Sequence, residues 1–397
     1  MKLSKRLSSL PPYLFVEINR KIAEKKARGE EVISFALGDP DMPTPPHIID
    51  SLCDSAHEEE NHRYPESVGM PEFRQAVATW YKKRFNVELD SEAEVVSLIG
   101  SKEGIGHIAF CLIDDGDIAL VPDPAYPVYS IGTTLAGGEP YYMPLLEKNK
   151  FLPDFDSIPS SVLEKTKVMW LNYPNNPTGA LADLEFFTRA VNFARSNDIL
   201  ICHDNPYSEI YFSNKKPPSI LQVANAKDVA IEFHSLSKTY NMTGWRIGMA
   251  VGNPESVKAL GIIKSNLDSG APQAIQEAAI TALESPPEIV QANIDVYRKR
   301  RNLVCEVLGD IGLTVTPPEG GLYVWAKVPS GYSSVEFTNS LLDQCNVAVT
   351  PGTGYGKYGE GFVRFSLTIH DALLVKGLSR LGNWKDDKQP FKTKSRP

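Results

Sequence analysis

The chain has 397 residues, a length that favours two domains and a large core. With 41 basic and 49 acidic side chains its net charge is −8, which argues against nucleic acid or an anionic membrane as the main partner. The five cysteines are scattered without a C-x-x-C pair, and neither a signal peptide nor a membrane-spanning run is evident, so we expect a cytoplasmic protein without a metal framework.

The first part of the chain predicts helices and one strand, followed by a turn. The strand, residues 32–37, ends in GDPDMPTPP, where Gly38 allows the backbone to approach a ligand closely. Proline at the first turn supports the last of the helices. The predicted helices span residues 13–25, 47–56 and 71–85.

From about residue 95, apolar runs alternate with helical stretches such as 184–196. Continuous apolar runs are typical of strands covered on both faces, as in parallel sheets, and the alternation predicts an α/β domain. Ligands of such sheets bind outside the carboxyl ends of the strands. The predicted strands are 95–99, 118–121, 168–171, 199–202, 229–233 and 247–251.

The C-terminal part predicts a second, α+β domain. A charged helix from Val296 onward is followed by strands at 320–328 and 361–367, with a helix at 334–344 between them. We expect residues 1–45 and 291–397 to form this small domain and residues 46–290 the large one. The polar tail, 385–397, is predicted to be disordered.

Lys238 lies between two predicted buried strands, in the stretch EFHSLSKTYNMTGWRIG. A lysine there is a candidate Schiff-base former, because desolvation makes its amine nucleophilic. Ser235, Ser237 and Arg246 supply the hydroxyls and the planar cation that a phosphate monoester needs. Lysine beside a phosphate site suggests pyridoxal phosphate. The alternative is a surface loop with an ordinary lysine.

Two further strand ends carry residues suited to the same ligand. Ser101 and Lys102 follow Gly100 and open a helix, which makes an anion site, although serine is also an ordinary helix cap. Tyr126 lies close to prolines on both sides, so its ring is well oriented to stack on a flat cofactor. The alternative for Tyr126 is a place in the core.

The remaining strand ends supply an amide, an acid and a phenol. Asn176 follows the strand at 168–171, and its side chain could either reach the cofactor or stabilise the turn in which it lies. Asp204 could keep a ring nitrogen protonated, and Tyr207 could donate to the ring oxygen. Strand alternation turns His203 to the other face, so we interpret it as structural.

Arg364 is an arginine inside an apolar strand, so it needs a partner. It could bind a substrate carboxylate with two hydrogen bonds, or belong to a structural ion pair.

Taken in order, N-x-x-N-P-T-G, D-x-x-Y, S-x-S-K, G-W-R-I-G and F-x-R-F-S resemble the class I/II aminotransferases of the fold-type I pyridoxal phosphate enzymes. The resemblance covers nearly the whole chain. It implies a homodimer with shared active sites, a large domain with a mostly parallel seven-stranded sheet, and a small α+β domain built from both chain ends. It also implies a two-step ping-pong transfer between amino acids and 2-oxo acids.

The resemblance assigns roles by position. Lys238 matches the Schiff-base lysine and proton carrier, Asp204 the partner of the ring nitrogen, and Tyr207 and Asn176 the donors to the ring oxygen. Tyr126 matches the stacking ring, and the phosphate site comprises Ser101, Lys102, Ser235, Ser237, Arg246 and, from the neighbouring subunit, Tyr64. Arg364 matches the residue that binds the substrate carboxylate, with help from Asn176 and the backbone of Gly38.

Four stretches, GDPDMPTP, IGSKEGIGH, HDNPYSEI and IEFHSLSKTYNMTGWRIG, look closest to the branch that exchanges an amino group between LL-2,6-diaminopimelate and 2-oxoglutarate in lysine biosynthesis. Tyr13 and Lys102 match positions that contact substrate there, and Glu103 is a further candidate for the distal ammonium. The chain departs from this branch at LDSG, where Asp268 and Ser269 stand near an expected asparagine. Distal recognition can differ accordingly.

Three other functions remain open at this point. The donor could be aspartate, alanine or an aromatic amino acid, or the enzyme could be a lyase that eliminates at Cβ or Cγ. A cofactor-binding transcription regulator is disfavoured, because the chain is acidic and starts directly at the enzyme domain.

Overall fold

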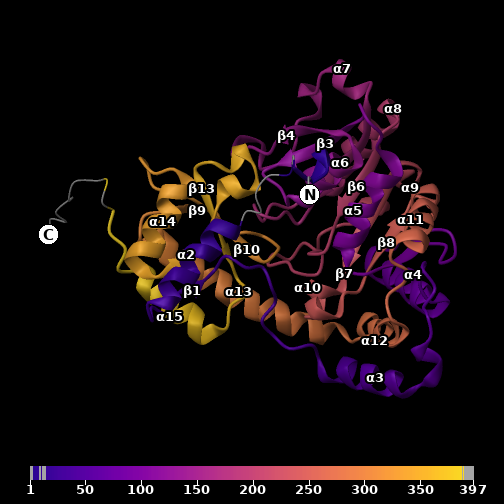
Figure 1. The fold of residues 1–397 in the computed structure, drawn as a ribbon, viewed down its shortest axis with the longest axis horizontal. Helices are drawn as coiled ribbons and strands as arrows, with labels where there is room; N and C mark the ends of the chain where they lie inside the picture. Colours follow the sequence, from indigo (N-terminus) through magenta and orange to yellow (C-terminus); the bar gives the residue numbers. More distant parts are fainter. Residues whose placement is uncertain (1–2, 9, 11–14, 387, 389–397) are drawn as a thin grey trace.

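The computed structural model describes residues 3–8, 10, 15–386 and 388. Figure 1 shows a larger body around one sheet and a smaller body built from both ends of the sequence, in indigo and yellow, with the long helix α13 (Pro287–Asp310) running between them. Within the described residues, no helix combines the length and the apolar character needed to cross a bilayer. Residue 13 and most of the polar C-terminal tail lie outside the described part of the chain.

The larger sheet has seven strands, in the order β2-β8-β7-β6-β5-β3-β4. All neighbouring pairs are parallel except those that involve β8. The expected α/β fold with a mostly parallel seven-stranded sheet is therefore confirmed. The strands are β2 (Val95–Leu98), β3 (Ile118–Asp123), β4 (Glu139–Pro144), β5 (Thr166–Asn172), β6 (Leu200–Asp204), β7 (Ala230–Ser235) and β8 (Gly248–Gly252).

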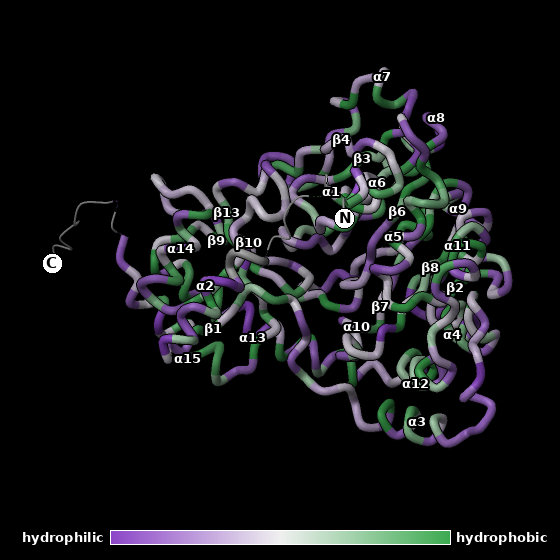
Figure 2. Tube along the Cα trace, viewed as in Figure 1, coloured by the Kyte–Doolittle hydropathy of each residue, from purple (hydrophilic) through white to green (hydrophobic). Residues whose placement is uncertain are grey.

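The two faces of this sheet are covered by different sets of helices. Met169 and Leu171 of β5 join a core cluster with side chains from α4, α8 and α12, whereas Val168 and Trp170 join a cluster with α5, α6 and α11. Both faces are thus apolar, which explains the unbroken apolar runs (Figure 2). These helices are α4 (Pro71–Phe85), α5 (Ser101–Leu112), α6 (Val128–Ala136), α8 (Leu184–Asn197), α11 (Pro254–Leu267) and α12 (Gln273–Leu283).

The smaller body contains a four-stranded sheet, β12-β13-β10-β9, and a parallel pair, β1-β11. The pair joins residues 33–34 to residues 347–348, so the two ends of the chain meet there. A separate core cluster underlies both sheets. The elements are β1 (Ile33–Ser34), β9 (Thr314–Val315), β10 (Tyr323–Lys327), β11 (Val347–Ala348), β12 (Thr350–Pro351), β13 (Phe362–Ser366), α2 (Phe15–Ala27), α14 (Ser334–Cys345) and α15 (Asp371–Leu381).

Three details differ from the elements predicted from sequence. The predicted strand 32–37 is reduced to two residues, and the helix predicted from Val296 begins at Pro287, where proline occupies its first turn. Strand β4 was not predicted, because its EPYYMP sequence contains two prolines and it lies at the edge of the sheet.

The remaining helices are α1 (Lys5–Ser8), α3 (Pro46–His57), α7 (Ser160–Leu163), α9 (Ala226–Val229) and α10 (Leu236–Thr239).

Candidate active site

A cavity of about 1250 Å³ opens between the carboxyl ends of the parallel strands and the smaller body. Apart from Tyr64 and Glu103, every site residue that was predicted from sequence and is described by the structure lines it. These residues are Gly38, Ser101, Lys102, Tyr126, Asn176, Asp204, Tyr207, Ser235, Ser237, Lys238, Arg246 and Arg364. Side chains far apart in the sequence thus meet in one place, as expected for the open edge of an α/β sheet.

Lys238 lies on the short helix α10, directly after β7. Its Nζ donates a 2.9 Å hydrogen bond to the carbonyl oxygen of Gly38. Burial lowers the pKa of Lys238, and the neighbouring Tyr323 and Asp39 partly offset this effect. A lysine with a lowered pKa is more often neutral at physiological pH, which is the form that attacks a carbonyl group or accepts a proton.

Asp204, the last residue of β6, is buried and has two differently used oxygens. Oδ2 accepts a 2.6 Å hydrogen bond from the hydroxyl of Tyr129. Oδ1 is buried and has no hydrogen-bond partner among the described residues. Burial raises the pKa of Asp204 to about 6, against the lowering effect of Tyr129, His203 and Lys238. A buried, unpaired carboxylate oxygen that faces a cavity is suited to a protonated ring nitrogen.

His203 lies on the opposite face of β6 from this carboxylate, as strand alternation predicts. Its Nδ1 is 2.8 Å from Glu232, whose buried carboxylate also accepts a hydrogen bond from Tyr81. These contacts are within the core, so they support the structural interpretation of His203.

The turn after β5 separates two asparagines by role. Asn175 fixes the turn, because its side-chain oxygen accepts from both the backbone N–H and the hydroxyl of Thr178. The side chain of Asn176 is left for the cavity, where its Oδ1 accepts a 2.9 Å hydrogen bond from Nη1 of Arg364. Asn175 therefore stabilises the turn, whereas the side chain of Asn176 is directed toward Arg364.

Arg364 on β13 is 3% exposed and makes no ion pair with a described residue. Its Nη2 donates to the carbonyl oxygen of Ala36 at 2.6 Å, whereas its Nε has no partner in the described part of the chain. The guanidinium carbon lies 4.0 Å from the ring centre of Tyr323 and 4.8 Å from that of Tyr355. A buried cation with spare donors and no acid beside it is suited to a ligand carboxylate.

The other end of the cavity is polar and suited to a phosphate. Ser101 is the first residue of the twelve-residue helix α5, and the N–H groups in the first turn of a helix have no partner within it, so they favour an anion there. At Gly100, with φ of 74°, an added Cβ would lie 2.3 Å from Nη2 of Arg246. The guanidinium of Arg246 therefore packs directly on this loop. The hydroxyl of Ser235 accepts a hydrogen bond from the backbone N–H of Ser237, so part of its hydrogen-bonding capacity is already used.

The cavity also contains Lys102, whose Nζ lies 6.0 Å from the ring centre of Tyr126. Tyr64 is elsewhere: its side chain is 95% exposed and lines no part of the cavity of its own chain. Tyr13 lies outside the described residues.

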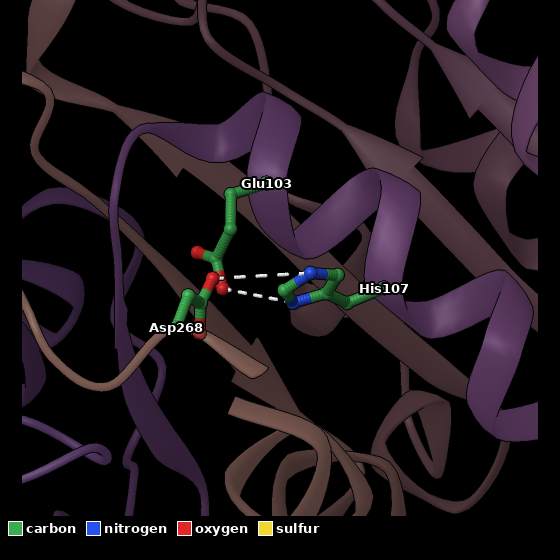
Figure 3. Close-up of side chains that lie close together, drawn as sticks. All are labelled: Glu103, His107 and Asp268. Atoms are coloured by element: carbon green, nitrogen blue, oxygen red, sulfur yellow. Dashed lines mark ion pairs between the residues drawn. The ribbon is translucent and has the colours of Figure 1, made fainter. Parts of the chain in front are cut away.

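Glu103 does not line the cavity. Figure 3 shows its carboxylate beside His107 and Asp268, in a group of ligand types that metals use. The buried ammonium of Lys264 lies 2.9 Å from Oε1 of Glu103, and Oε2 accepts the backbone N–H of Ile99. Because Lys264 already pairs with Glu103, we interpret the group as an ion-pair cluster that holds the start of α5 against α11.

Three tyrosines at the site were missed by sequence reasoning: Tyr129, Tyr323 and Tyr355. None of them follows directly on a strand end, which was the signal used. Tyr129 follows Tyr126 by three residues, one turn along the chain, and this spacing could have indicated it. Tyr323 and Tyr355 reach the site from the smaller body, and no local pattern marks them.

With this geometry established, comparison with known proteins decides the family. The profile described as "Aminotransferase class I and II" matches residues 30–381. The chain belongs to this family. A relative from Dehalococcoides mccartyi, named LL-diaminopimelate aminotransferase, is 59% identical over 385 residues, which are 97% of this chain and 99% of the relative.

Solved structures of the family have the same fold. Substrate-bound BacF from Bacillus subtilis matches with a TM-score of 0.90 at 36% identity, over 96% of this chain and 98% of that one. A Thermus thermophilus aspartate aminotransferase variant matches with a TM-score of 0.90 at 27% identity, over 96% and 99%. The chain is therefore a fold-type I aminotransferase, and enzymes of this family use pyridoxal 5′-phosphate.

The cavity fits this cofactor by its own chemistry. The unpaired Oδ1 of Asp204 suits the protonated pyridine nitrogen, and the end lined by Ser101 and Arg246 suits the phosphate. Lys238 supplies the amine for the aldehyde. The residues present thus match a flat aromatic ring with a cation at one edge, a dianion at another and an electrophile facing the lysine.

Proposed function

We propose that this aminotransferase moves an amino group between LL-2,6-diaminopimelate and 2-oxoglutarate, a reaction of lysine biosynthesis. The observation that carries the proposal is 59% identity, over 97% of the chain, to a relative named for the first of these substrates. Relatives of the same name from Aquifex aeolicus and Moorella thermoacetica, both 54% identical over almost the full length, support it.

The chemistry is shared between cofactor and protein. Bound pyridoxal phosphate supplies an aldehyde that accepts the amino group and a conjugated ring that delocalises the charge left at Cα. Asp204 holds the ring nitrogen in its protonated form, which favours that delocalisation. Lys238 is the base that takes the proton from the substrate Cα and returns one on the other side of the reaction, because its pKa is lowered and it faces the cavity.

The substrate is positioned by the opposite wall. Arg364 binds the α-carboxylate through its unpartnered Nε and its remaining N–H donors, with Asn176 as its hydrogen-bonded neighbour. In this proposal Tyr207 and Asn176 donate to the ring oxygen and Tyr126 stacks on the ring, and all three line the cavity. Lys102 lies at the same cavity and is our candidate for a group at the distal end of the substrate.

The functional unit in this proposal is a homodimer. Tyr64 is almost fully exposed and lines no part of the cavity of its own chain, and we propose that it contacts the phosphate bound by the neighbouring subunit. Tyr13 is proposed as a substrate contact. The cytoplasmic location and the division into domains 1–45 plus 291–397 and 46–290 remain predictions.

The donor is tested by single half-reactions. The purified enzyme, loaded with cofactor, is mixed with LL-diaminopimelate, its meso isomer, aspartate, alanine or tyrosine, and the loss of visible absorbance is followed. We expect the LL isomer to convert the cofactor to its amino form faster than the others at equal concentration. Faster conversion by aspartate, alanine or tyrosine would replace the proposed donor.

A second candidate function keeps the reaction and changes the donor. It is favoured by the similarity to an aspartate aminotransferase and by the departure at Asp268 and Ser269 from the expected asparagine. A lyase is a third candidate, and release of ammonia without any 2-oxo acid would distinguish it from both.

A further inference from the structure

Tyr323 occupies a central place in the site that sequence reasoning gave to no residue. It is 3% exposed, lines the cavity and lies on β10, the strand paired with the Arg364 strand β13. Trp325 is directly opposite Arg364, so Tyr323, two residues away, is on the same face and diagonal to the arginine.

The ring of Tyr323 is a flat support for the guanidinium. The guanidinium carbon of Arg364 lies 4.0 Å from its ring centre, closer than the 4.8 Å to Tyr355. Among the described residues, Nη1 bonds to Asn176 and Nη2 to the carbonyl oxygen of Ala36, whereas Nε has no hydrogen-bond partner. Hydrogen bonds in the plane of the guanidinium resist its rotation within that plane, and an aromatic ring against its face limits its tilt out of the plane.

The hydroxyl of Tyr323 contacts a different part of the site. Its oxygen is 3.3 Å from the hydroxyl oxygen of Tyr207. A Cβ added to Gly38 would lie 2.0 Å from the same oxygen, which is a physical reason for glycine at that position. The carbonyl oxygen of Gly38 is in turn the acceptor for Nζ of Lys238.

From these contacts we propose that Tyr323 is a positioning residue of the transamination site. Its ring fixes the plane in which Arg364 receives the substrate carboxylate, and its hydroxyl fixes the direction of the Tyr207 hydroxyl. The inference rests on the proposed carboxylate-binding role of Arg364. It adds a residue that links the carboxylate end of the site to the end that contacts the cofactor ring.

The ring is tested by binding of glutarate, which has the two carboxylates of 2-oxoglutarate without its reactive carbonyl. Calorimetry with the cofactor-loaded enzyme compares the wild type with Tyr323→Met, which removes the ring but refills much of its volume. Loss of a stacked cation–π contact predicts an affinity weaker by roughly threefold to thirtyfold. In steady-state kinetics, KM for the amino donor should rise more than kcat falls, whereas a folding defect would lower kcat alone.

The hydroxyl is tested separately by Tyr323→Phe, which keeps the ring. Glutarate affinity should stay within about twofold of the wild type, because the cation–π contact remains. The pH midpoint of the visible absorbance of the bound cofactor should move upward, because Tyr207 without a hydrogen bond from Tyr323 is a weaker donor to the ring oxygen. Tyr297→Phe is the matched control: Tyr297 is also buried and stacked on an arginine, but lies outside the cavity.

The variant Arg364→Lys separates two possible failures: that Tyr323 has no positioning role, or that Arg364 does not bind the substrate carboxylate. If the lysine variant loses glutarate binding while both Tyr323 variants keep wild-type affinity and midpoint, the positioning role is wrong and the carboxylate site stands. If Arg364→Lys also binds glutarate normally, the proposed role of Arg364 fails and the inference fails with it.

Discussion

The hydroxyl of Tyr129 donates a 2.6 Å hydrogen bond to Oδ2 of Asp204, deep in the core below the cavity. The ring of Tyr129 is stacked on Trp170 at 4.8 Å, so the donor is held in place. The bond occupies one carboxylate oxygen and leaves the other for the cofactor. Tyr129 thus orients this carboxylate, and its hydrogen bond lowers the pKa of Asp204 against the larger raising effect of burial.

Removing this donor should weaken the hold on the cofactor. Tyr129→Phe keeps the packing but removes a hydrogen bond to a charged group, a contribution of roughly 1.5–3 kcal/mol. Because Asp204 is more fully ionised when the cofactor is bound, we expect the dissociation constant of pyridoxal phosphate to rise about tenfold. Fluorescence titration of the apoenzyme measures it. Tyr173→Phe is the control, since that buried hydroxyl donates only to the carbonyl of Phe151; equal effects of both changes would contradict the account.

Asp204 should make the stability of the apoenzyme depend on pH. Its pKa in the folded protein is raised to about 6, above the value near 3.8 of an ordinary aspartate. The protonated form is therefore favoured by folding, and the stabilisation is complete below about pH 4 and lost as pH rises through 6. The change is roughly 3 kcal/mol. Thermal unfolding of apoenzyme and of Asp204→Asn from pH 4 to 8 should show the wild type losing stability relative to the variant; parallel curves would rule this titration out.

A methyl group at Gly100 should disturb the phosphate end of the site. Gly100→Ala places a Cβ at φ of 74°, 2.3 Å from Nη2 of Arg246, so the arginine has to move. We expect weaker binding of pyridoxal phosphate with little loss of binding for pyridoxal, which lacks the phosphate. Gly106→Ala, inside the helix α5 that Gly100 precedes and with nothing within 4 Å of the added Cβ, should instead stabilise the fold by roughly 0.5–1 kcal/mol. Equal loss for both ligands in Gly100→Ala would contradict a phosphate-specific effect.

Arg300 should stabilise the segment that carries Gly38. Its guanidinium binds both oxygens of Asp41, at 2.6 and 2.9 Å, and Nε binds Asp371 at 2.7 Å. Arg300→Met leaves Asp41 with an uncompensated charge, and since Asp371 is exposed we expect a loss of about 2–3 kcal/mol in unfolding free energy.

The matched control for this change is Arg298→Met in the same helix. Arg298 pairs with Asp295 near the surface, so its loss should cost less than about 1 kcal/mol. Denaturant unfolding measures both variants. A similar loss in the two would show that the Asp41 contact has no special weight.

Much of the site could be predicted because the chemistry of an α/β sheet gathers at one edge. Each apolar run predicted a strand, and the residues directly after it, such as Asp204 and Lys238, were placed together without knowledge of the strand order. The family resemblance selected Asn176, and the hydrogen bonds supply the physical reason, because its neighbour Asn175 fixes the turn. Sequence motifs therefore located the site. Which hydrogen bonds each of two adjacent side chains makes could be learned only from the structure.

The tyrosines that surround these groups could not be predicted in the same way. Tyr323 meets Arg364 through a strand register, and Tyr129 meets Asp204 across 75 residues of chain. Neither relationship has a local pattern, because an aromatic residue in a helix or strand reads as core whatever it contacts. Edge strand β4 was missed for a related reason: its prolines argue against a strand unless its position at the edge is known.

Turnover of LL-diaminopimelate by the purified enzyme tests the central claim most directly. Glutamate formation is measured with and without 2-oxoglutarate, and Lys238→Ala serves as the inactive reference. The account predicts turnover that requires 2-oxoglutarate, favours the LL over the meso isomer and disappears in the lysine variant. No 2-oxoglutarate-dependent turnover of the LL isomer, in an enzyme that binds its cofactor, would contradict it.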